Sequence, residues 1–175
     1  MTRGKGTCLT PTIADNSVRQ GRCATAPERG CNMSATWEGS FTVGQLLQDV
    51  LAGELPRPPE HNGVYAVTEF AWSGAPTTGA RVLYVGTTTG RSRRFRTRIG
   101  DLMADLFGFY GTETRHHSGG QKLHEYCMTN ELHPFDLHIG WLPDVPSRTG
   151  FETHYYDTLK PLLNQKRPPQ VDADD

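Results

Sequence analysis

The first periodic segment of the chain follows a long polar start. Behind Thr42, a residue type that caps helices, apolar positions recur at helical spacing until Gly53 and a Pro-rich stretch end the pattern. We therefore expect a lead-in helix and a Pro-rich connection within residues 36–60. Residues 1–35 have few apolar positions and no helical or strand periodicity. Such a segment buries too little surface to offset the entropy of ordering, so we expect a disordered or weakly ordered tail.

Three later segments have the pattern of strands. Residues 63–72 form an apolar run that places Val64, Ala66 and Phe70 on one face and Tyr65 and Val67 on the other. Residues 81–86 form a second short apolar run after a loop rich in Gly, Ser, Thr and Pro. Because the loop is short, these two strands are expected to be antiparallel neighbours. Clean alternation over residues 135–141 predicts a third, half-buried strand.

Helices are predicted between and after these strands. In residues 92–106 apolar side chains recur at positions i, i+4, i+7 and i+11, which is typical of one buried helix face. A second helix is predicted over residues 121–131, with Ser118 as a candidate cap. A third is predicted over residues 149–159, and Pro161 stops it.

This order of elements predicts an α+β fold. We expect a small three-stranded, mainly antiparallel sheet flanked by helices in a domain over residues 61–168, followed by an acidic frayed tail at 169–175. The length of 175 residues and the 35% apolar content allow one domain with a modest core. No run approaches the ~20 apolar residues that cross a bilayer, and the start has no secretory pattern, so we expect a cytoplasmic protein without a membrane span.

Cysteines and short motifs narrow the function classes. The four cysteines form no C-x-x-C pair, which favours free thiols in a reducing compartment over a zinc site or a disulfide. The chain also has no P-loop, dinucleotide fingerprint, H-E-x-x-H or G-x-S-x-G motif. Nothing here predicts a nucleotide-binding, zinc-protease or serine-hydrolase site.

Charge is unevenly distributed along the chain. The formal net charge is only −1, yet residues 70–100 contain no Asp or Glu and carry six arginines. Acidic residues elsewhere, three of them in the last four positions, balance this segment. A near-neutral total can therefore include one basic face, the kind of surface that binds nucleic acid.

Two glycine–tyrosine patterns frame the paired strands. Gly63-Val64-Tyr65 opens the first run and Tyr84-Val85-Gly86 closes the second, with the arginine cluster just after it. Downstream, Glu152 and Asn164 stand twelve positions apart around Lys160-Pro161-Leu162-Leu163. In this order the pieces resemble the GIY-YIG nuclease domain, from about residue 63 to residue 167. The resemblance implies a small three-stranded sheet with helices beside it, and metal-dependent cleavage of phosphodiester bonds.

The resemblance also implies roles for the two tyrosines and an arginine. Tyr65 is expected to be the general base or its hydrogen-bond relay, and Tyr84 to position the water or the phosphate. A phenol with a pKa near ~10 needs a nearby cation before it can act as a base at neutral pH. Arg94, ten residues after Tyr84, matches the family's catalytic arginine, and a planar guanidinium can hold two phosphate oxygens. The alternative is that Tyr65 and Tyr84 are structural strand residues without a catalytic role.

Other basic residues are candidates for binding and for the proton relay. The remaining arginines of the cluster are expected to grip backbone phosphates, or else to form a solvated helix face; they are Arg91, Arg93, Arg96 and Arg98. Many relatives have a histidine one turn after the arginine, where this chain has Arg98. We expect a histidine from another segment to take that role, with His117 favoured over His116 and His124.

The carboxylate and the amide complete the expected site. Glu152 is expected to anchor one Mg²⁺ (or Mn²⁺), since a single carboxylate suffices when water and substrate phosphate fill the other positions. No second acid lies three or four residues from it, which argues against a two-metal site. Asn164 resembles the family asparagine that orients the glutamate or the phosphate, although an exposed glutamate and a turn asparagine are the plainer interpretations.

These observations favour a metal-dependent endonuclease that acts on nucleic acid, with double-stranded DNA favoured over RNA. A restriction-type enzyme is expected to form a homodimer, whereas a repair or mobile-element nuclease can nick as a monomer. The main alternative is a catalytically inactive nucleic-acid-binding module on the same scaffold. A protein that docks its arginine helix on an acidic partner is a further alternative.

Overall fold

The computed structural model describes residues 36–88, 94–109, 116–143, 145 and 148–165, which belong to one compact unit spanning Met33–Asp175. The expected tails at 1–35 and 169–175 lie outside the described residues. None of the helices within these described ranges is long and apolar enough to cross a membrane.

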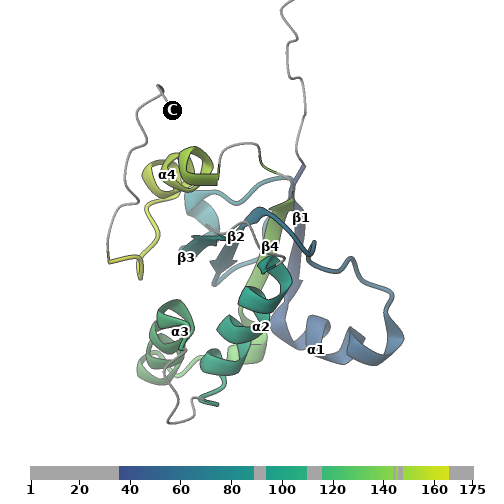
Figure 1. The fold of residues 1–175 in the computed structure, drawn as a ribbon. Coiled ribbons are helices and arrows are strands. Elements are labelled where there is room, and N and C mark those ends of the chain that lie inside the picture. Colours follow the sequence, from purple (N-terminus) through teal and green to yellow (C-terminus); the bar gives the residue numbers. More distant parts are fainter. Residues whose placement is uncertain (1–35, 89–93, 110–115, 144, 146–147, 166–175) are drawn as a thin grey trace, which may run out of the picture. The chain divides into compact units, whose positions relative to one another are not determined.

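A four-stranded antiparallel sheet forms the centre of this unit (Figure 1). The strands lie in the order β1-β4-β2-β3. Their bounds are β1 Glu38–Thr42, β2 Gly63–Thr68, β3 Val82–Thr87 and β4 His138–Pro143. The α+β class and the antiparallel pairing of β2 with β3 are confirmed.

The expected count of three strands is wrong, because β1 adds a fourth strand at the edge, beside β4. Its sequence, Glu-Gly-Ser-Phe-Thr, has no alternation of apolar and polar residues, and so it gives no periodic signal. The register also shifts between Glu38 and Phe41. Pairing with β4, rather than local propensity, makes this segment a strand.

Four α-helices accompany the sheet, with bounds α1 Val43–Ala52, α2 Phe95–Leu106, α3 Ser118–Thr129 and α4 Arg148–Leu159. The expected Thr42 cap is confirmed: its side chain accepts a hydrogen bond from the Gln45 amide, and the Gln45 side chain bonds back to the Thr42 amide. Gly53 ends α1 in the left-handed conformation that favours glycine.

Several element boundaries differ from the sequence-based ones. The strand expected over 63–72 ends at Thr68, although the Glu69 and Phe70 amides still donate to the Arg81 and Ala80 carbonyls ahead of β3. The third strand begins later than expected, since Pro134–Asp136 form a short 3₁₀ turn. The second helix begins at Ser118 and is capped by His117 rather than by Ser118. A histidine ring nitrogen and a serine hydroxyl oxygen can both accept a hydrogen bond from a first-turn amide. The sequence alone therefore does not decide between His117 and Ser118 as the cap.

Two apolar cores lie on opposite faces of the sheet. One lies between the sheet and the helices α2 and α3, and the other lies between the sheet and α4 (Figure 1). Alternation along β2 supplies both: Tyr65 and Val67 enter the first core, and Val64 and Ala66 enter the second. The one described cysteine, Cys127, is a buried free thiol in the first core.

A close approach between β2 and β3 sets the position of both framed tyrosines. Tyr65 pairs with Gly86, and a Cβ built on Gly86 would lie 2.3 Å from the Tyr65 hydroxyl oxygen. Glycine is required here because the Tyr65 ring occupies the space of a side chain. Val67 pairs with Tyr84 and Thr68 with Val82, so β3 has one extra residue, a β-bulge. Tyr65 and Tyr84 consequently lie on one face, with ring centroids 6.1 Å apart.

Gly86→Ala is expected to destabilise the protein by ~1–3 kcal/mol, because the new methyl group collides with the Tyr65 ring. Gly100→Ala is the matched control: it lies in α2, and a Cβ there meets no atom within 4 Å. That change is expected to stabilise the protein by up to ~1 kcal/mol. Urea unfolding of both variants checks the pair, and equal effects would contradict the packing described above.

Candidate active site

The Tyr65 and Tyr84 rings form the floor of the candidate site. Tyr65 is fully buried, whereas Tyr84 is only partly buried. Burial raises the pKa of Tyr65 well above its usual value, the neighbouring Tyr84 raises it further, and Arg98 opposes the shift. Burial likewise raises the pKa of Tyr84. Both phenols are therefore protonated in the free protein at neutral pH.

His117 joins the pair from the N-terminus of α3. Its Nε2 atom lies 2.8 Å from the Tyr65 hydroxyl oxygen. Its ring also packs edge-on against Tyr84, with centroids 5.8 Å apart. Burial and the Arg98 charge lower the pKa of His117 to about 4, so the imidazole is neutral at neutral pH. The sequence-based preference for His117 over the other histidines agrees with this placement.

Two glycines let α3 approach the tyrosines and α2. A Cβ on Gly119 would lie 2.5 Å from the Tyr84 ring, and a Cβ on Gly120 would lie 2.6 Å from the Leu102 carbonyl oxygen of α2. Larger residues at these positions would push the helix start away from the site. The Ser118-Gly119-Gly120 segment thus serves close packing, a role that its sequence alone does not distinguish from an ordinary loop.

Arg98 is the cation at the centre of the described site. Its charge lowers the pKa of Tyr65, Tyr84, His117 and Glu152. The sequence analysis assigned this arginine to backbone phosphates and gave the central role to Arg94. On geometry, Arg98 is the guanidinium that the fold brings to the phenols, because it lies one helical turn further along α2.

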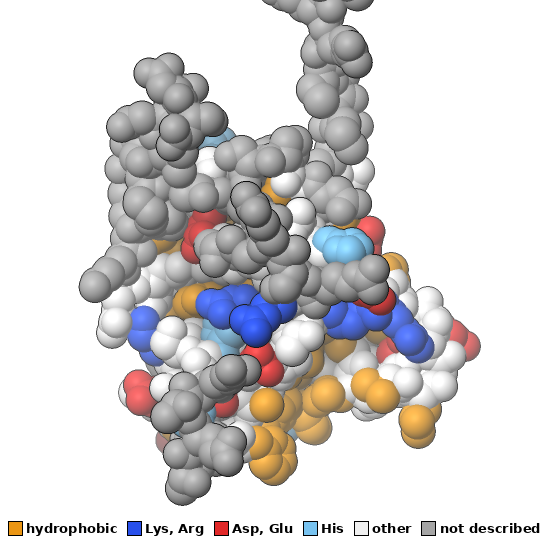
Figure 2. Space-filling model, viewed as in Figure 1, with side chains coloured by type: hydrophobic (Ala, Val, Ile, Leu, Met, Phe, Trp, Pro, Cys, Tyr) orange, Lys and Arg blue, Asp and Glu red, His pale blue; other side chains and the backbone are white. Residues whose placement is uncertain are grey.

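Arg94 borders a cleft beside this centre. The cleft has a volume of about 350 Å³ and is lined by Arg94, Arg98, Asp101, His116 and His117. Figure 2 shows Lys and Arg side chains gathered across the middle of one face of the molecule. Two guanidinium groups beside one cleft make it suited to an anion of the size of a phosphodiester.

Glu152 reaches the site from α4, on the other side of the sheet from α2 and α3. It lies near enough to raise the pKa of both tyrosines. Burial raises its own pKa, and the Arg98 charge partly opposes this shift. The fold thus brings together Tyr65, Tyr84, Arg98, His117 and Glu152, which are spread over nearly ninety positions of the chain.

Asn164 has a different partner from the expected one. Its side-chain oxygen accepts from the Val85 amide at 3.0 Å, and its side-chain nitrogen donates to the Val85 carbonyl at 2.8 Å. The Leu162 and Leu163 amides also donate to β3 carbonyls. The segment after α4 therefore covers the outer edge of β3 next to Tyr84, so Asn164 holds the tyrosine strand. A contact of Asn164 with Glu152 or a phosphate stays a prediction.

The other predicted site residues lie at the margins or beyond the described chain. His124 Nδ1 lies 3.0 Å from the Leu106 carbonyl oxygen at the end of α2, and His116 Nδ1 lies 3.8 Å from Asp105. Arg96 donates to the Pro58 carbonyl and pairs with Glu60 at 3.7 Å. Arg91 and Arg93 fall outside the described residues.

The residues of the site suit at most one divalent ion. Within the described ranges no three His, Cys, Asp or Glu side chains gather as a ready-made metal site. Glu152 is a partly desolvated carboxylate on which the Arg98 charge acts, and Arg98 lines the phosphate-sized cleft. One such carboxylate fits a Mg²⁺ ion that keeps several waters and shares a substrate phosphate. A two-metal arrangement does not fit this donor set.

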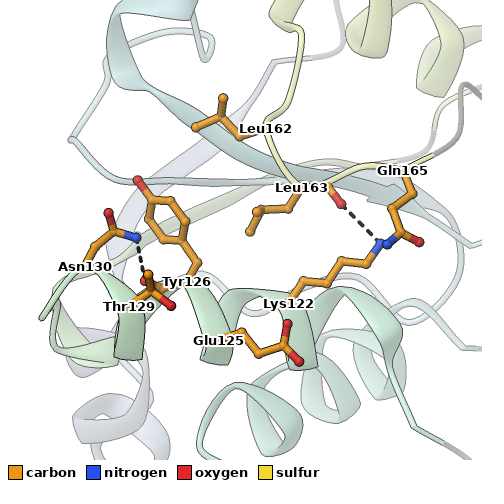
Figure 3. A pocket seen from close by; sticks show the side chains of 8 residues that line it. All are labelled: Lys122, Glu125, Tyr126, Thr129, Asn130, Leu162, Leu163 and Gln165. Carbon is orange, nitrogen blue, oxygen red and sulfur yellow. Dashed lines mark hydrogen bonds between the residues drawn. The ribbon is translucent and has the colours of Figure 1, made fainter.

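A second hollow lies away from the tyrosines, between α3 and the segment after α4 (Figure 3). Lys122 points across it and donates to the Leu163 carbonyl at 3.2 Å. Tyr126 in its wall donates to Glu69 at 2.8 Å, and Glu69 also accepts from Arg81. Lys122, Tyr126 and Glu69 therefore already have hydrogen-bond partners within the protein, so these side chains serve packing between α3 and the segment after α4.

No protein-family model, no curated protein and no solved structure matches this chain. The resemblance to GIY-YIG nucleases accordingly stays a prediction, and the argument for function depends on the geometry of the site.

Sequence reasoning missed two acidic residues near the site. Asp105 is 4% exposed and accepts a hydrogen bond from the His117 amide. A signal existed: Asp105 stands between Leu102 and Leu106 in the predicted buried stripe, where an acid needs a partner. Asp101 lines the arginine cleft three residues after Arg98, and its sequence spacing is that of an ordinary helix ion pair.

Glu152→Gln is expected to raise the melting temperature at pH 7. A carboxyl whose pKa is raised on folding makes the folded protein less stable as pH rises through that pKa, because the unfolded chain releases the proton more readily. The gain should therefore vanish below about pH 4, where the carboxyl is protonated in both states. Melting curves between pH 4 and pH 8 measure it. Glu125→Gln, at an exposed position on α3, is the control and should show no such pH-dependent gain.

Proposed function

We propose that the protein is a metal-dependent endonuclease that hydrolyses phosphodiester bonds in nucleic acid, with DNA as the favoured substrate. One observation carries this proposal: two phenols, a neutral imidazole and a carboxylate have shifted pKa values, and the Arg98 guanidinium acts on all four, although the five groups come from five separate elements. Perturbed titratable groups gathered beside a cleft are typical of catalytic sites. A cytoplasmic location is part of the same proposal.

The burial of the two tyrosines divides their roles. The sequence leaves two roles open for Tyr65, general base or hydrogen-bond relay. Because Tyr65 is fully buried, its position favours the relay role. Tyr84 is only partly buried and is the phenol that a water or a phosphate oxygen can meet. In the proposed reaction Tyr84 first loses its proton to solvent, assisted by the Arg98 charge, which lowers its pKa. The water oxygen then attacks phosphorus and its proton passes to the Tyr84 oxygen. The P–O bond to the 3′ oxygen breaks, and that oxygen takes up a proton from solvent. The product then carries a 5′-phosphate.

Positive charge in the cleft would bind the substrate and stabilise the transition state. Arg98 lies against the phenols, where charge develops during attack, and Arg94 can hold a phosphate at the cleft wall. Glu152 would hold a divalent ion, which supplies further positive charge at the phosphate. Arg96, the second residue of α2, would contact a neighbouring backbone phosphate.

Glu152→Gln is expected to abolish cleavage of plasmid DNA in Mg²⁺, with a loss of roughly 10³-fold or more in rate. The variant keeps the volume of the side chain and removes the charge that would hold the ion. Conversion of supercoiled plasmid to nicked and linear forms measures the rate and also shows whether one strand or both are cut. Glu125→Gln is the matched control and should cut like the wild type.

Binding of the same plasmid, measured by filter retention, separates the proposal from its main alternative. If the wild-type protein binds DNA tightly but cuts no DNA or RNA in Mg²⁺ or Mn²⁺, the protein is a nucleic-acid-binding module and the hydrolase proposal fails. One observation favours this alternative: both phenols have raised pKa values, so neither is a ready base in the free protein.

The two cleft arginines are expected to differ in their effects. Arg98→Ala should lower kcat by roughly 10²–10³-fold, because the charge beside the phenols is lost. Arg94→Ala should mainly raise KM, because Arg94 reaches the cleft wall and none of the phenol pKa values depends on it. Steady-state cleavage of a short labelled duplex measures both constants. The reverse order of effects would return the central role to Arg94.

A further inference from the structure

The N-terminus of α3 holds the His117 ring by one edge. Gly120 donates its amide proton to the His117 carbonyl at 2.7 Å, and the same amide points at the ring nitrogen Nδ1 at 3.3 Å. His117 is thus the N-cap residue of α3, with its ring in the position that a serine or asparagine side chain usually takes.

This contact fixes which ring nitrogen carries the proton. A neutral imidazole has one N–H donor and one bare acceptor. A proton on Nδ1 would face the Gly120 amide proton, two donors pointing at each other, so Nδ1 must be the acceptor. The proton is therefore on Nε2, and Nε2 is the atom that lies 2.8 Å from the Tyr65 hydroxyl oxygen. His117 donates that hydrogen bond and Tyr65 accepts it.

The direction of this bond constrains the Tyr65 hydroxyl group. Because the Tyr65 oxygen accepts from His117, its own proton points away from the imidazole. The Tyr84 ring stacks beside Tyr65, with centroids 6.1 Å apart, and packs edge-on against His117. The hydrogen bonds run one way, from the Gly120 amide through His117 to the Tyr65 hydroxyl beside the half-buried phenol.

We propose that His117 is a positioning residue, locked by the α3 N-terminus as a hydrogen-bond donor, which orients the Tyr65 hydroxyl beside Tyr84 for the hydrolysis proposed above. The inference depends on the proposed function for its catalytic consequence, but the direction of the hydrogen bonds is a property of the folded protein alone. In this arrangement His117 is not a general base toward Tyr65, because its bare nitrogen faces the helix.

Asp105 of α2 holds the backbone of His117 in place. Its carboxylate accepts from the His117 backbone amide, and its other oxygen lies 3.8 Å from His116. At 4% exposure, Asp105 is closed off from the cleft that Asp101 lines. Burial and the Arg98 charge favour the neutral imidazole, which agrees with a ring that never needs to carry two protons.

Two substitutions of His117 separate capping from donation. His117→Asn keeps an acceptor for the Gly120 amide, and asparagine is among the best N-cap residues, but its short side chain cannot reach Tyr65. His117→Gln places an amide N–H near the position of Nε2 and gives up the cap. We expect His117→Asn to melt near the wild-type temperature with kcat lowered by roughly 10²-fold and KM unchanged.

His117→Gln is expected to show the opposite pattern, with a lower melting temperature and a kcat within ~10-fold of the wild type. A purely structural role for His117 predicts that activity follows stability, so that His117→Asn cuts well and His117→Gln cuts poorly. That result would overturn the proposal.

The tautomer can be observed without any cleavage assay. Long-range ¹H–¹⁵N NMR correlations of the full chain at pH 7 should show His117 with its proton on Nε2, with the signal assigned by its loss in His117→Asn. An Nδ1-protonated ring would refute the lock whether or not the protein cuts nucleic acid. If the Nε2 tautomer is found and wild-type protein cuts nothing, the proposed hydrolysis fails and the direction of the hydrogen bonds stands.

Discussion

The Tyr65 ring fills the side-chain space of Gly86, and the site is arranged around that contact. A ring in this place is fully buried and still brings its hydroxyl to the surface of α3, where His117 meets it. The neighbouring Tyr84 is set on the same face by the pairing register of β2 and β3. A side chain at residue 86 would displace the first ring and with it the contact to the imidazole.

Opposing effects act on the pKa values of the two phenols. Burial raises the pKa of both tyrosines, and Glu152 raises them further from the other side of the sheet. Arg98 is the described cation that acts against all of these shifts. In the proposed function a bound phosphate would interact with the same guanidinium, so that one side chain would couple phosphate binding to phenol ionisation. An added divalent cation at Glu152 would reverse the sign of the carboxylate's effect on the phenols.

Much of the fold was predictable from local pattern, and the exceptions have physical causes. The capped helix after Thr42, the paired strands around Tyr65 and Tyr84 and the apolar stripe of α2 all follow from periodicity and capping chemistry. Strand β1 did not, because pairing with β4 holds it together. In the site, the arginine that acts on the phenol pKa values is Arg98, one helical turn after Arg94, for which the sequence predicts the central role. Asn164 bonds to the Val85 backbone, and its expected contact with Glu152 or a phosphate stays a prediction.

The amino-acid sequence by itself determined which chemical groups were available and which faces were apolar. Side chains two apart in a strand share a face, and side chains three or four apart in a helix do likewise, so these relations are local. Tertiary structure alone decided that Glu152 comes near enough to act on the pKa values of the tyrosines, that Arg98 is the central cation, and that the α3 N-terminus holds the His117 ring. These contacts join segments that no sequence period relates, and their distances are set by how the sheet and three helices pack.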